Sequence, residues 1–413
     1  GGWWAWDPVE NVSFMPWLLC TALLHSVTVT EKRNTLKGWT MFLAISAFSF
    51  SLIGTFIVRS GILTSVHAFA NDPSRGLYLL VIILIIILTA FLIFLLRYNK
   101  FSSDLYFSFF SKETGLIFNN LLLTTTVFVI FVGTLWPIIF ETFTNKKVSV
   151  GAPFFDLVTT PFFLFLALIL PFGSSLNWKE GKIKKNFSHL PLTILITFII
   201  FLFTWYYQGS NDLTAPLGIL FSFWVILGSV IELLKKLKIK KSNFSINLKF
   251  FNSSELSKFI SHVGFGLLIF GISAVISWES EDIRTINIGE KFTLSKYKFQ
   301  LESIETKFIN NYKADIAKIK VFKNEMFVTY IYPQKRIYPV QNTLTTEAGI
   351  DSNVFRDIYL VLGDKQDNGS WVLRTYIKPF LLFIYIGIII LSLGGLIGLI
   401  KKSTFFKNKK MIS

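Results

Sequence analysis

The chain has very little cysteine, with one residue in 413. A single cysteine excludes an internal disulfide scaffold, a cysteine-based zinc site and an iron–sulfur cluster. It also excludes a CxxCH motif, so the chain is not itself a c-type cytochrome. Histidine is scarce as well, at four residues, and each can be weighed singly as a ligand.

Charged residues are also scarce in the chain. Charged residues make up only 16% of the chain, whereas soluble domains carry about 25%. Hydrophobic residues reach 52%, with 45 phenylalanines and 11 tryptophans, and mean hydropathy is +0.55. These values exclude an ordinary soluble protein and a disordered chain. Sequence repeats and low-complexity tracts are also absent.

The apolar residues gather in nine runs, most of about the 20 residues that a bilayer-spanning helix needs. The run 76–96 is the clearest because it holds no charge at all, whereas 154–175 is the least clear because it contains Asp156 and two prolines. We therefore predict an all-α polytopic membrane protein. The predicted spans are 13–30, 38–58, 76–96, 116–140, 154–175, 189–207, 213–234, 259–277 and 378–400.

The positive charge follows the loops between these runs. One alternating set of loops, counted with the tail 401–413, holds 22 of the 41 lysines and arginines. The positive-inside rule places this set in the cytoplasm, together with the basic tail 401–413. The net charge of +16 therefore predicts contact with anionic membrane lipid rather than with nucleic acid.

A water-facing segment, 278–377, interrupts the apolar pattern. It holds 14 basic and 13 acidic residues. Alternating stretches such as KFTLSKYKFQLESIE and RDIYLVLG are separated by turn-like breaks at Asn310-Asn311, at Tyr332-Pro333 and at 364–369. This pattern predicts a small β-rich domain on the outer side of the membrane, between a bundle of about eight spans at 13–277 and the last span.

The first 17 residues, GGWWAWDPVENVSFMPW, are rich in tryptophan. An aromatic belt at the membrane interface would explain one or two tryptophans, but not a cluster interleaved with acidic residues. Flat apolar rings held by polar groups suit a large planar ligand. We predict that Asp7 and Glu10 orient this platform rather than exchange protons. Its tryptophans are Trp3, Trp4, Trp6 and Trp17.

This motif resembles the tryptophan-rich WWD signature of haem-handling membrane proteins, and its WDPVEN form resembles the CcmF family. Further segments resemble that family in the same order: TALLHSVTVTEKR, LIGTFIVRSGILTSVHAFANDPSRG, ISHVGFGLLIFG, KRIYPVQ, TEAGID, RDIYLVLG and WVLRTYIKP. The CcsA-type synthetases and the nitrite-reductase assembly lyase share the tryptophan motif. The β-rich domain favours CcmF or its nitrite-reductase paralogue.

The resemblance implies a haem lyase of cytochrome c biogenesis, in a bacterial inner membrane or a mitochondrial inner membrane. Such a protein receives haem from the chaperone CcmE and attaches it by thioether bonds to the CxxCH motif of apocytochrome c. CcmH and CcmI are further implied partners, and quinol is an implied reductant. Family members have further helices upstream of the motif. Since the chain starts with glycine, we expect a C-terminal fragment that lacks them.

His25 and His262 fall at similar depth in two predicted spans that run in opposite directions. At 1.5 Å per residue, both imidazoles would lie in the inner half of the membrane, where an ionisable residue indicates a functional site. Two such residues suit the axial positions of one haem iron. The resemblance to CcmF implies the same pair as ligands of an intramembrane b-type haem.

The other two histidines fall in loops. The resemblance implies that His67, in the outer loop 59–75, is one ligand of a periplasmic haem whose second ligand lies upstream. Arg59 and Arg75 flank that loop and are candidate contacts for haem propionates, or they mark the ends of spans. His189 is predicted to be interfacial without a role. Cys20 is predicted to be a small buried apolar residue, so no nucleophile is assigned.

Two other functional classes remain open at this stage. A haem transporter would explain many spans and a tryptophan site, but transporters usually show internal repeats. A non-catalytic assembly scaffold would have no need of two intramembrane histidines at matching depth. Haem bound to the purified chain would separate a lyase from a scaffold. Haem flux into vesicles without apocytochrome would indicate a transporter.

Overall fold

A computed structural model describes residues 3–61, 73–101, 107–179, 187, 190–210, 212–236, 253–340 and 343–410. The chain divides into two compact units, Gly1–Pro191 and Leu192–Ser413. Within the described residues, nine helices are long and apolar enough to cross a membrane. The protein is therefore a multi-pass membrane protein, and each unit is described by itself.

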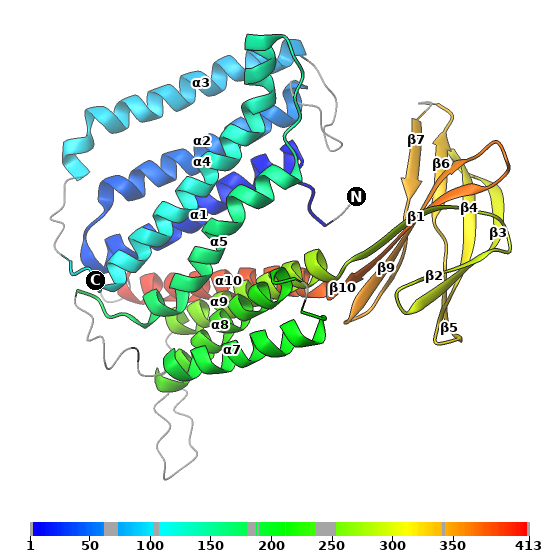
Figure 1. Cartoon of the computed structure of the whole chain (residues 1–413). Helices are drawn as coiled ribbons and strands as arrows, with labels where there is room; N and C mark the ends of the chain where they lie inside the picture. Colours follow the sequence, from blue (N-terminus) through cyan, green and yellow to red (C-terminus); the bar gives the residue numbers. More distant parts are fainter. Residues whose placement is uncertain are drawn as a thin grey trace. The chain divides into compact units, whose positions relative to one another are not determined.

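The first unit is a bundle of long helices (Figure 1). Helix α1 packs against α2 and α4, helix α4 packs against α5, and α3 packs against α2. A short 3₁₀ turn, η1, follows α3. The bounds are α1 Pro8–Arg33, α2 Lys37–Ser60, α3 Pro73–Leu96, η1 Tyr98–Phe101, α4 Lys112–Thr144 and α5 Ala152–Ser175.

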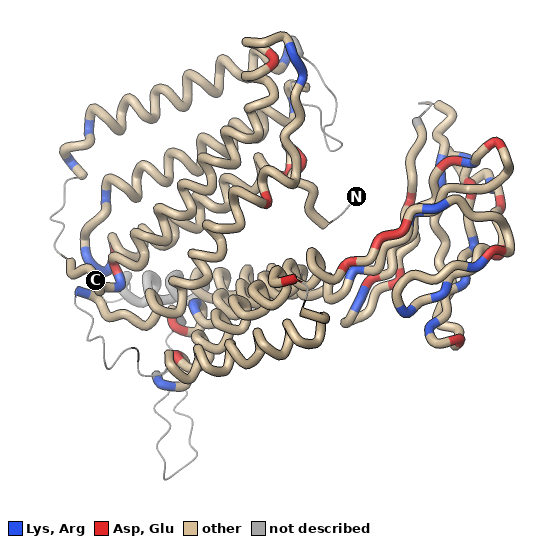
Figure 2. Tube along the Cα trace, viewed as in Figure 1, with Lys and Arg blue, Asp and Glu red and all other residues tan. Residues whose placement is uncertain are grey.

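Hydropathy explains which of these helices face lipid. Helix α3 has the highest hydropathy, 3.6, and only 6% of its apolar window is buried, so the other described helices leave most of its apolar surface uncovered. Lysines and arginines gather near the helix ends, and long stretches between them are uncharged (Figure 2). Pro16, Pro137, Pro161 and Pro171 lie inside helices of this unit. Membrane helices tolerate such prolines because neighbouring groups satisfy the freed backbone.

In the second unit, α9 packs against both α8 and α10. Small residues permit this close approach: a Cβ placed on Gly394 would lie 2.6 Å from the backbone nitrogen of Ser261. Serine hydroxyls add bonds between the helices, since Ser257 Oγ donates to Gly394 O at 2.7 Å and Ser222 Oγ donates to Gly266 O at 2.8 Å. This is the small-residue packing of membrane helices. The bounds are α7 Leu190–Tyr207, which begins at the unit boundary, α8 Thr214–Lys236, α9 Ser253–Trp278 and α10 Leu382–Lys410.

A β-sandwich is inserted between α9 and α10 (Figure 1). One sheet has the order β1-β10-β9-β8; the other has the order β2-β3-β4-β6-β7, with β5 also paired to β4. All pairs are antiparallel. The bounds are β1 Ser280–Ile286, β2 Lys291–Leu294, β3 Tyr297–Ile309, β4 Tyr312–Lys323, β5 Met326–Ile331, β6 Gln334–Tyr338, β7 Thr343–Glu347, β8 Gly349–Ser352, β9 Arg356–Lys365 and β10 Trp371–Pro379.

The core of the sandwich comes from alternate residues on both sheets. Phe299, Ile319 and Leu360 are fully buried, and they belong to strands β3, β4 and β9. The strict alternation along β9, from buried Arg356 to buried Leu362, is the period-two pattern that the sequence displays. The sandwich therefore has a hydrophobic core of its own.

The predicted fold class, a polytopic α-helical membrane protein with a β-rich domain, is confirmed. Several helix boundaries differ from the predicted spans, and two of these differences have a clear structural cause. Helix α1 starts at Pro8 rather than at residue 13, because Asp7 caps it. Helix α10 starts at Leu382 rather than at residue 378, because residues up to Pro379 extend strand β10, and it continues to Lys410 in the predicted tail.

Candidate functional site

The acidic residues of the tryptophan motif start helix α1. Asp7 is the N-cap, and its side chain accepts a hydrogen bond from Val9 N–H at 3.0 Å. Glu10 Oε2 accepts from the backbone N–H of Asp7 at 3.1 Å and from that of Ala5 at 2.9 Å. This reciprocal arrangement is a capping box, with Pro8 in the first turn. Asp7 and Glu10 therefore shape the motif through its backbone.

Trp6 fastens the motif to helix α5. Its indole Nε1–H donates to Asp156 Oδ1 at 2.7 Å, and its ring stacks on Phe155 with centroids 5.1 Å apart. Its backbone has a φ of 54°, a left-handed value uncommon outside glycine. Asn11, which is 1% exposed, donates to Trp6 O at 3.2 Å and to Thr134 Oγ1 of α4 at 3.0 Å. Contacts with two helices thus hold the loop at this turn.

Trp4, Trp6, Phe14 and Trp17 form one aromatic cluster. Trp4 meets Trp6 and Phe14 edge to face, at centroid distances of 5.7 and 5.4 Å. Phe14 stacks on Trp17, with centroids 5.6 Å apart and planes inclined by 15°. Trp17 remains 40% exposed, so the described residues cover only part of the cluster. Trp3, which precedes Trp4 in the sequence, is half-buried.

His25 lies on α1, half-buried, and faces α4. Its Nδ1 is 2.7 Å from the carboxamide nitrogen of Asn119. Since this contact occupies Nδ1, Nε2 is the ring nitrogen left for another ligand. Asn119 was not singled out in the sequence, because an asparagine in an apolar run gives no signal of its partner.

His262 lies on α9 in the second unit and lines a small pocket with residues of α8 and α9. Lys258, one turn earlier, pairs with Glu232 of α8 at 2.5 Å and with Glu255 at 3.2 Å. Charged groups therefore surround this histidine near one end of its helix. The pocket residues are Ser229, Glu232, Leu233, Glu255, Lys258, Phe259 and His262.

Arg59 and Arg75 flank the 59–75 loop, and the other residues singled out in the sequence lie elsewhere or outside the described residues. Arg59 is in the last turn of α2, and Arg75 is in the first turn of α3. His67 and His189 lie outside the described residues. The prediction that Cys20 is buried is wrong: it is exposed on α1. A lipid-facing thiol carries no burial penalty, because lipid is itself apolar, so helix packing does not need to cover it.

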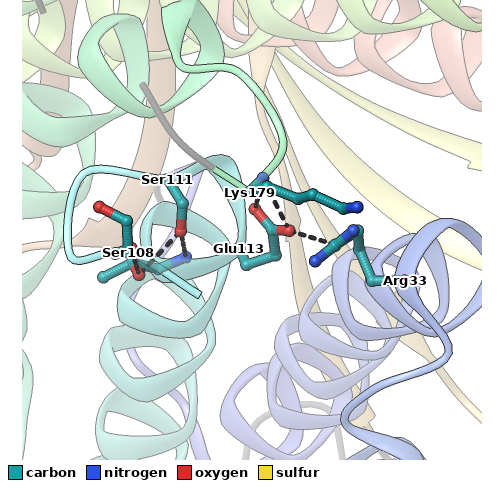
Figure 3. Close-up of polar contacts among 6 residues, drawn as sticks. Arg33, Ser108, Ser111, Glu113 and Lys179 are labelled. Carbon is teal, nitrogen blue, oxygen red and sulfur yellow. Dashed lines mark hydrogen bonds and ion pairs between the residues drawn. The ribbon is translucent and has the colours of Figure 1, made fainter. Parts of the chain in front are cut away.

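A buried ion pair ties three segments of the first unit together (Figure 3). Arg33 Nε, at the end of α1, lies 2.6 Å from Glu113 Oε1, whose side chain is fully buried in the first turn of α4. Both oxygens of Glu113 also accept from Lys179 N–H, at 3.1 and 3.2 Å. Ser111 caps α4 next to this pair through Thr114 N–H at 3.3 Å. The sequence indicated only separate loop charges here.

Comparisons with known proteins match the chain from end to end. Residues 277–379 match the family profile of the CcmF C-terminal beta-sandwich, and residues 1–64 match that of the cytochrome C assembly protein family. Over 395 residues the chain is 40% identical to cytochrome c-type biogenesis protein ccl1 of Rhodobacter capsulatus, covering 96% of this chain and 60% of that protein. The chain is therefore similar to CcmF proteins along its whole length.

Two further relatives match the chain over almost its whole length. The chain is 35% identical over 412 residues to CcmF of Pseudomonas aeruginosa, covering 100% of this chain and 62% of the relative. It is 33% identical over 404 residues to cytochrome c-type biogenesis protein NrfE of Haemophilus influenzae, covering 96% and 61%. The chain thus spans about three-fifths of the length of these relatives.

A solved structure titled "Cytochrome c Heme Lyase CcmF" has the same fold. The TM-score is 0.74 at 22% sequence identity, and the match covers 97% of this chain and 61% of that one. The likeness extends over both the helices and the sandwich.

The CcmF-like segments of the sandwich have structural partners. Arg356 of RDIYLVLG is 7% exposed; it pairs with the Asp351 carboxylate of TEAGID and donates from Nε to Tyr297 OH at 3.1 Å. Lys335 of KRIYPVQ is 8% exposed and pairs with Asp364. The Arg356–Tyr297 and Lys335–Asp364 bonds join the two sheets, whereas the Arg356–Asp351 pair lies within one sheet. These segments therefore contribute to the packing of the sandwich.

Proposed function

We propose that this chain is part of a haem lyase that attaches haem to apocytochrome c. The observation that carries the proposal is the anchored aromatic cluster, in which Trp6 is bonded to Asp156 while Trp17 stays 40% exposed. Rigid flat rings suit a planar macrocycle. Similarity to CcmF proteins supports the same activity.

The chemistry is addition of two thiols to the vinyl groups of haem. Each thiol sulfur of a CxxCH motif bonds to one vinyl carbon, and the thiol hydrogen is taken up at the other vinyl carbon, so the C=C π bond is replaced by C–S and C–H bonds. The thiols belong to the apocytochrome, since Cys20 is the chain's single cysteine. The chain's residues orient the substrates rather than attack them.

We further propose the outer side of the membrane as the place of reaction, with the aromatic cluster and the sandwich in the periplasm. The distribution of lysine and arginine between alternate loops supports this orientation. CcmE would deliver the haem substrate, and CcmH and CcmI would bring the apocytochrome. His67 would ligate the incoming haem iron, and Arg59 and Arg75 would pair with its propionates.

An intramembrane b-type haem would be held by His25 and His262, the pair that the sequence predicts. The residue types fit such a group: Asn119 contacts Nδ1 of His25, so Nε2 is the ring nitrogen that would bind once the Asn119 oxygen faces Nδ1–H, and His262 lines a pocket. When bound, this haem would supply reducing equivalents taken from quinol. His25 and His262 would supply the imidazole nitrogens that hold it.

The test is complementation of a cytochrome c maturation mutant with the complete protein that carries this segment. Haem that stays on the cytochrome after denaturing electrophoresis measures attachment. We expect attachment with the wild-type protein and a large loss with the Trp4→Ala/Trp17→Ala variant. Phe109→Ala serves as the matched control, because Phe109 is exposed elsewhere in the first unit. Unchanged attachment in the tryptophan variant would overturn the proposal, and haem flux into vesicles without apocytochrome would instead indicate a transporter.

A further inference from the structure

A polar contact in the first unit joins His25 of α1 to Asn119 of α4. The two polar side chains are half-buried on helices that pack together, with 2.7 Å between His25 Nδ1 and the carboxamide nitrogen. The same nitrogen lies 3.4 Å from Asn120 Oδ1, a longer contact. Asn119 is thus placed to act on the histidine.

The chemistry of the pair depends on which carboxamide atom faces the ring. A neutral imidazole has one N–H and one lone pair. With the carboxamide nitrogen toward Nδ1, Nδ1 must accept and Nε2 carries the hydrogen, so Nε2 has no lone pair for iron. A half-turn of the carboxamide about its Cβ–Cγ bond brings Oδ1 opposite Nδ1. The oxygen then accepts the Nδ1–H, and the Nε2 lone pair is free.

We propose that Asn119 is the positioning residue for His25 as a haem-iron ligand, an inference that rests on the function proposed above. With iron on Nε2, the Asn119 oxygen accepts the Nδ1–H, and this bond fixes the tautomer and the rotation of the ring. Histidines that ligate metals usually have such a partner on the other nitrogen. Without iron, the same carboxamide turns and donates instead.

A neutral carboxamide also sets the electronic character of the ligand. A carboxylate at this place would only accept, which would make the imidazole more basic and favour ferric iron. A carboxamide oxygen polarises the ring less and leaves the reduction potential higher. This suits a haem that must be reduced easily, and it gives the proposal a measurable quantity besides activity.

The experiment compares Asn119→Leu and Asn119→Asp with wild type in the detergent-purified protein. The readouts are the low-spin reduced spectrum, the rate of haem transfer to apomyoglobin and the midpoint potential. For Asn119→Leu we expect haem affinity to fall by about 10- to 100-fold, the usual effect of losing such a partner. For Asn119→Asp we expect a retained low-spin spectrum with a lower midpoint potential.

The control is Thr126→Val, which lies two turns along the same helix. Thr126 is 1% exposed, and its hydroxyl donates to Leu122 O of its own helix at 2.8 Å. We expect its spectrum, transfer rate and potential to match wild type, which separates the role of Asn119 from a general loosening of α4.

Two outcomes would overturn the inference in different ways. If His25→Ala and His262→Ala lose the haem while both Asn119 variants match wild type in all three readouts, the ligand pair stands and the role of Asn119 is refuted. If the histidine variants keep the haem, the ligand pair is wrong and Asn119 has no ligand to position. If Asn119→Leu fails to fold, the potential of Asn119→Asp decides alone.

Discussion

The indole nitrogen of Trp6 donates a 2.7 Å hydrogen bond to Oδ1 of Asp156, a residue 150 positions later in the chain. Asp156 made its span the least convincing of the nine in sequence. The bond gives a reason for an acidic residue in an apolar helix. A carboxylate near the start of α5 can hold the tryptophan motif in place. The stacking of Trp6 on Phe155 acts at the same point.

Removing this acceptor should disturb the aromatic cluster without removing any ring. For Asp156→Leu we expect covalent haem attachment to fall by about 10- to 100-fold, the scale of a misplaced substrate. Asp156→Asn keeps an oxygen for the indole N–H and should retain most of the attachment. Haem-stained cytochrome is the measurement. Equal attachment in the leucine and asparagine variants would show that the bond is dispensable.

The buried pair of Arg33 and Glu113 predicts a stability effect. Glu113→Gln keeps one oxygen for Lys179 N–H but leaves Arg33, 18% exposed, without its counter-charge. Breaking a buried pair costs about 3–5 kcal/mol, so the thermal unfolding midpoint in detergent should fall clearly. Adding Arg33→Met should recover part of the loss. Glu141→Gln, at the exposed far end of α4, is the control, and a similar fall there would contradict the prediction.

Two adjacent glycines of α10 test the packing against α9. A Cβ on Gly394 would lie 2.6 Å from Ser261 N, whereas a Cβ on Gly395 would meet no atom within 4 Å. Gly394→Ala should lower the unfolding midpoint, since overpacking costs about 1–3 kcal/mol. Gly395→Ala should leave it unchanged or raise it, because alanine is the better helix former. The same response from both variants would rule out close packing as the cause.

Tyr376 predicts a pH dependence for the sandwich. Burial, together with a hydrogen bond to Glu281, raises the pKa of the Tyr376 phenol to about 12, above its ordinary value of about 10. The folded state therefore keeps the proton in a range where the unfolded chain loses it. Stability from this group is full below pH 10 and declines as the pH rises toward 12. Between those values, Tyr376→Phe should show a shallower loss of unfolding midpoint than wild type.

The helices could be predicted because their signal is local. Each apolar run marks its own span, and strong alternation marked β3 and β9. Strands β6, β7 and β8 were missed because they have five, five and four residues, too few for alternation to be distinctive. Their place depends on partners elsewhere in the sandwich.

The contacts around the candidate site could not be predicted, for the same reason. Asn119 lies 94 positions from His25, and Asp156 is even farther from Trp6. Only the packing of α1 against α4, and of α4 against α5, brings such pairs together. Asp7 and Glu10 are the local exception: the sequence indicated that they orient the tryptophan loop, and the capping box of α1 supplies a structural basis for that role.

The sandwich enters and leaves the helices through a single pair of strands. Ser280 of β1 lies opposite Ile377 of β10, directly after α9 and shortly before α10. Since α9 and α10 already pack together, closing this long connection requires little ordering beyond that of the helices. We therefore expect the sandwich to behave as a separate domain that can be exchanged. An exchange between relatives, with cuts at the β1–β10 pair, should leave the helical hairpin intact and would allow partner choice to evolve separately from the membrane core.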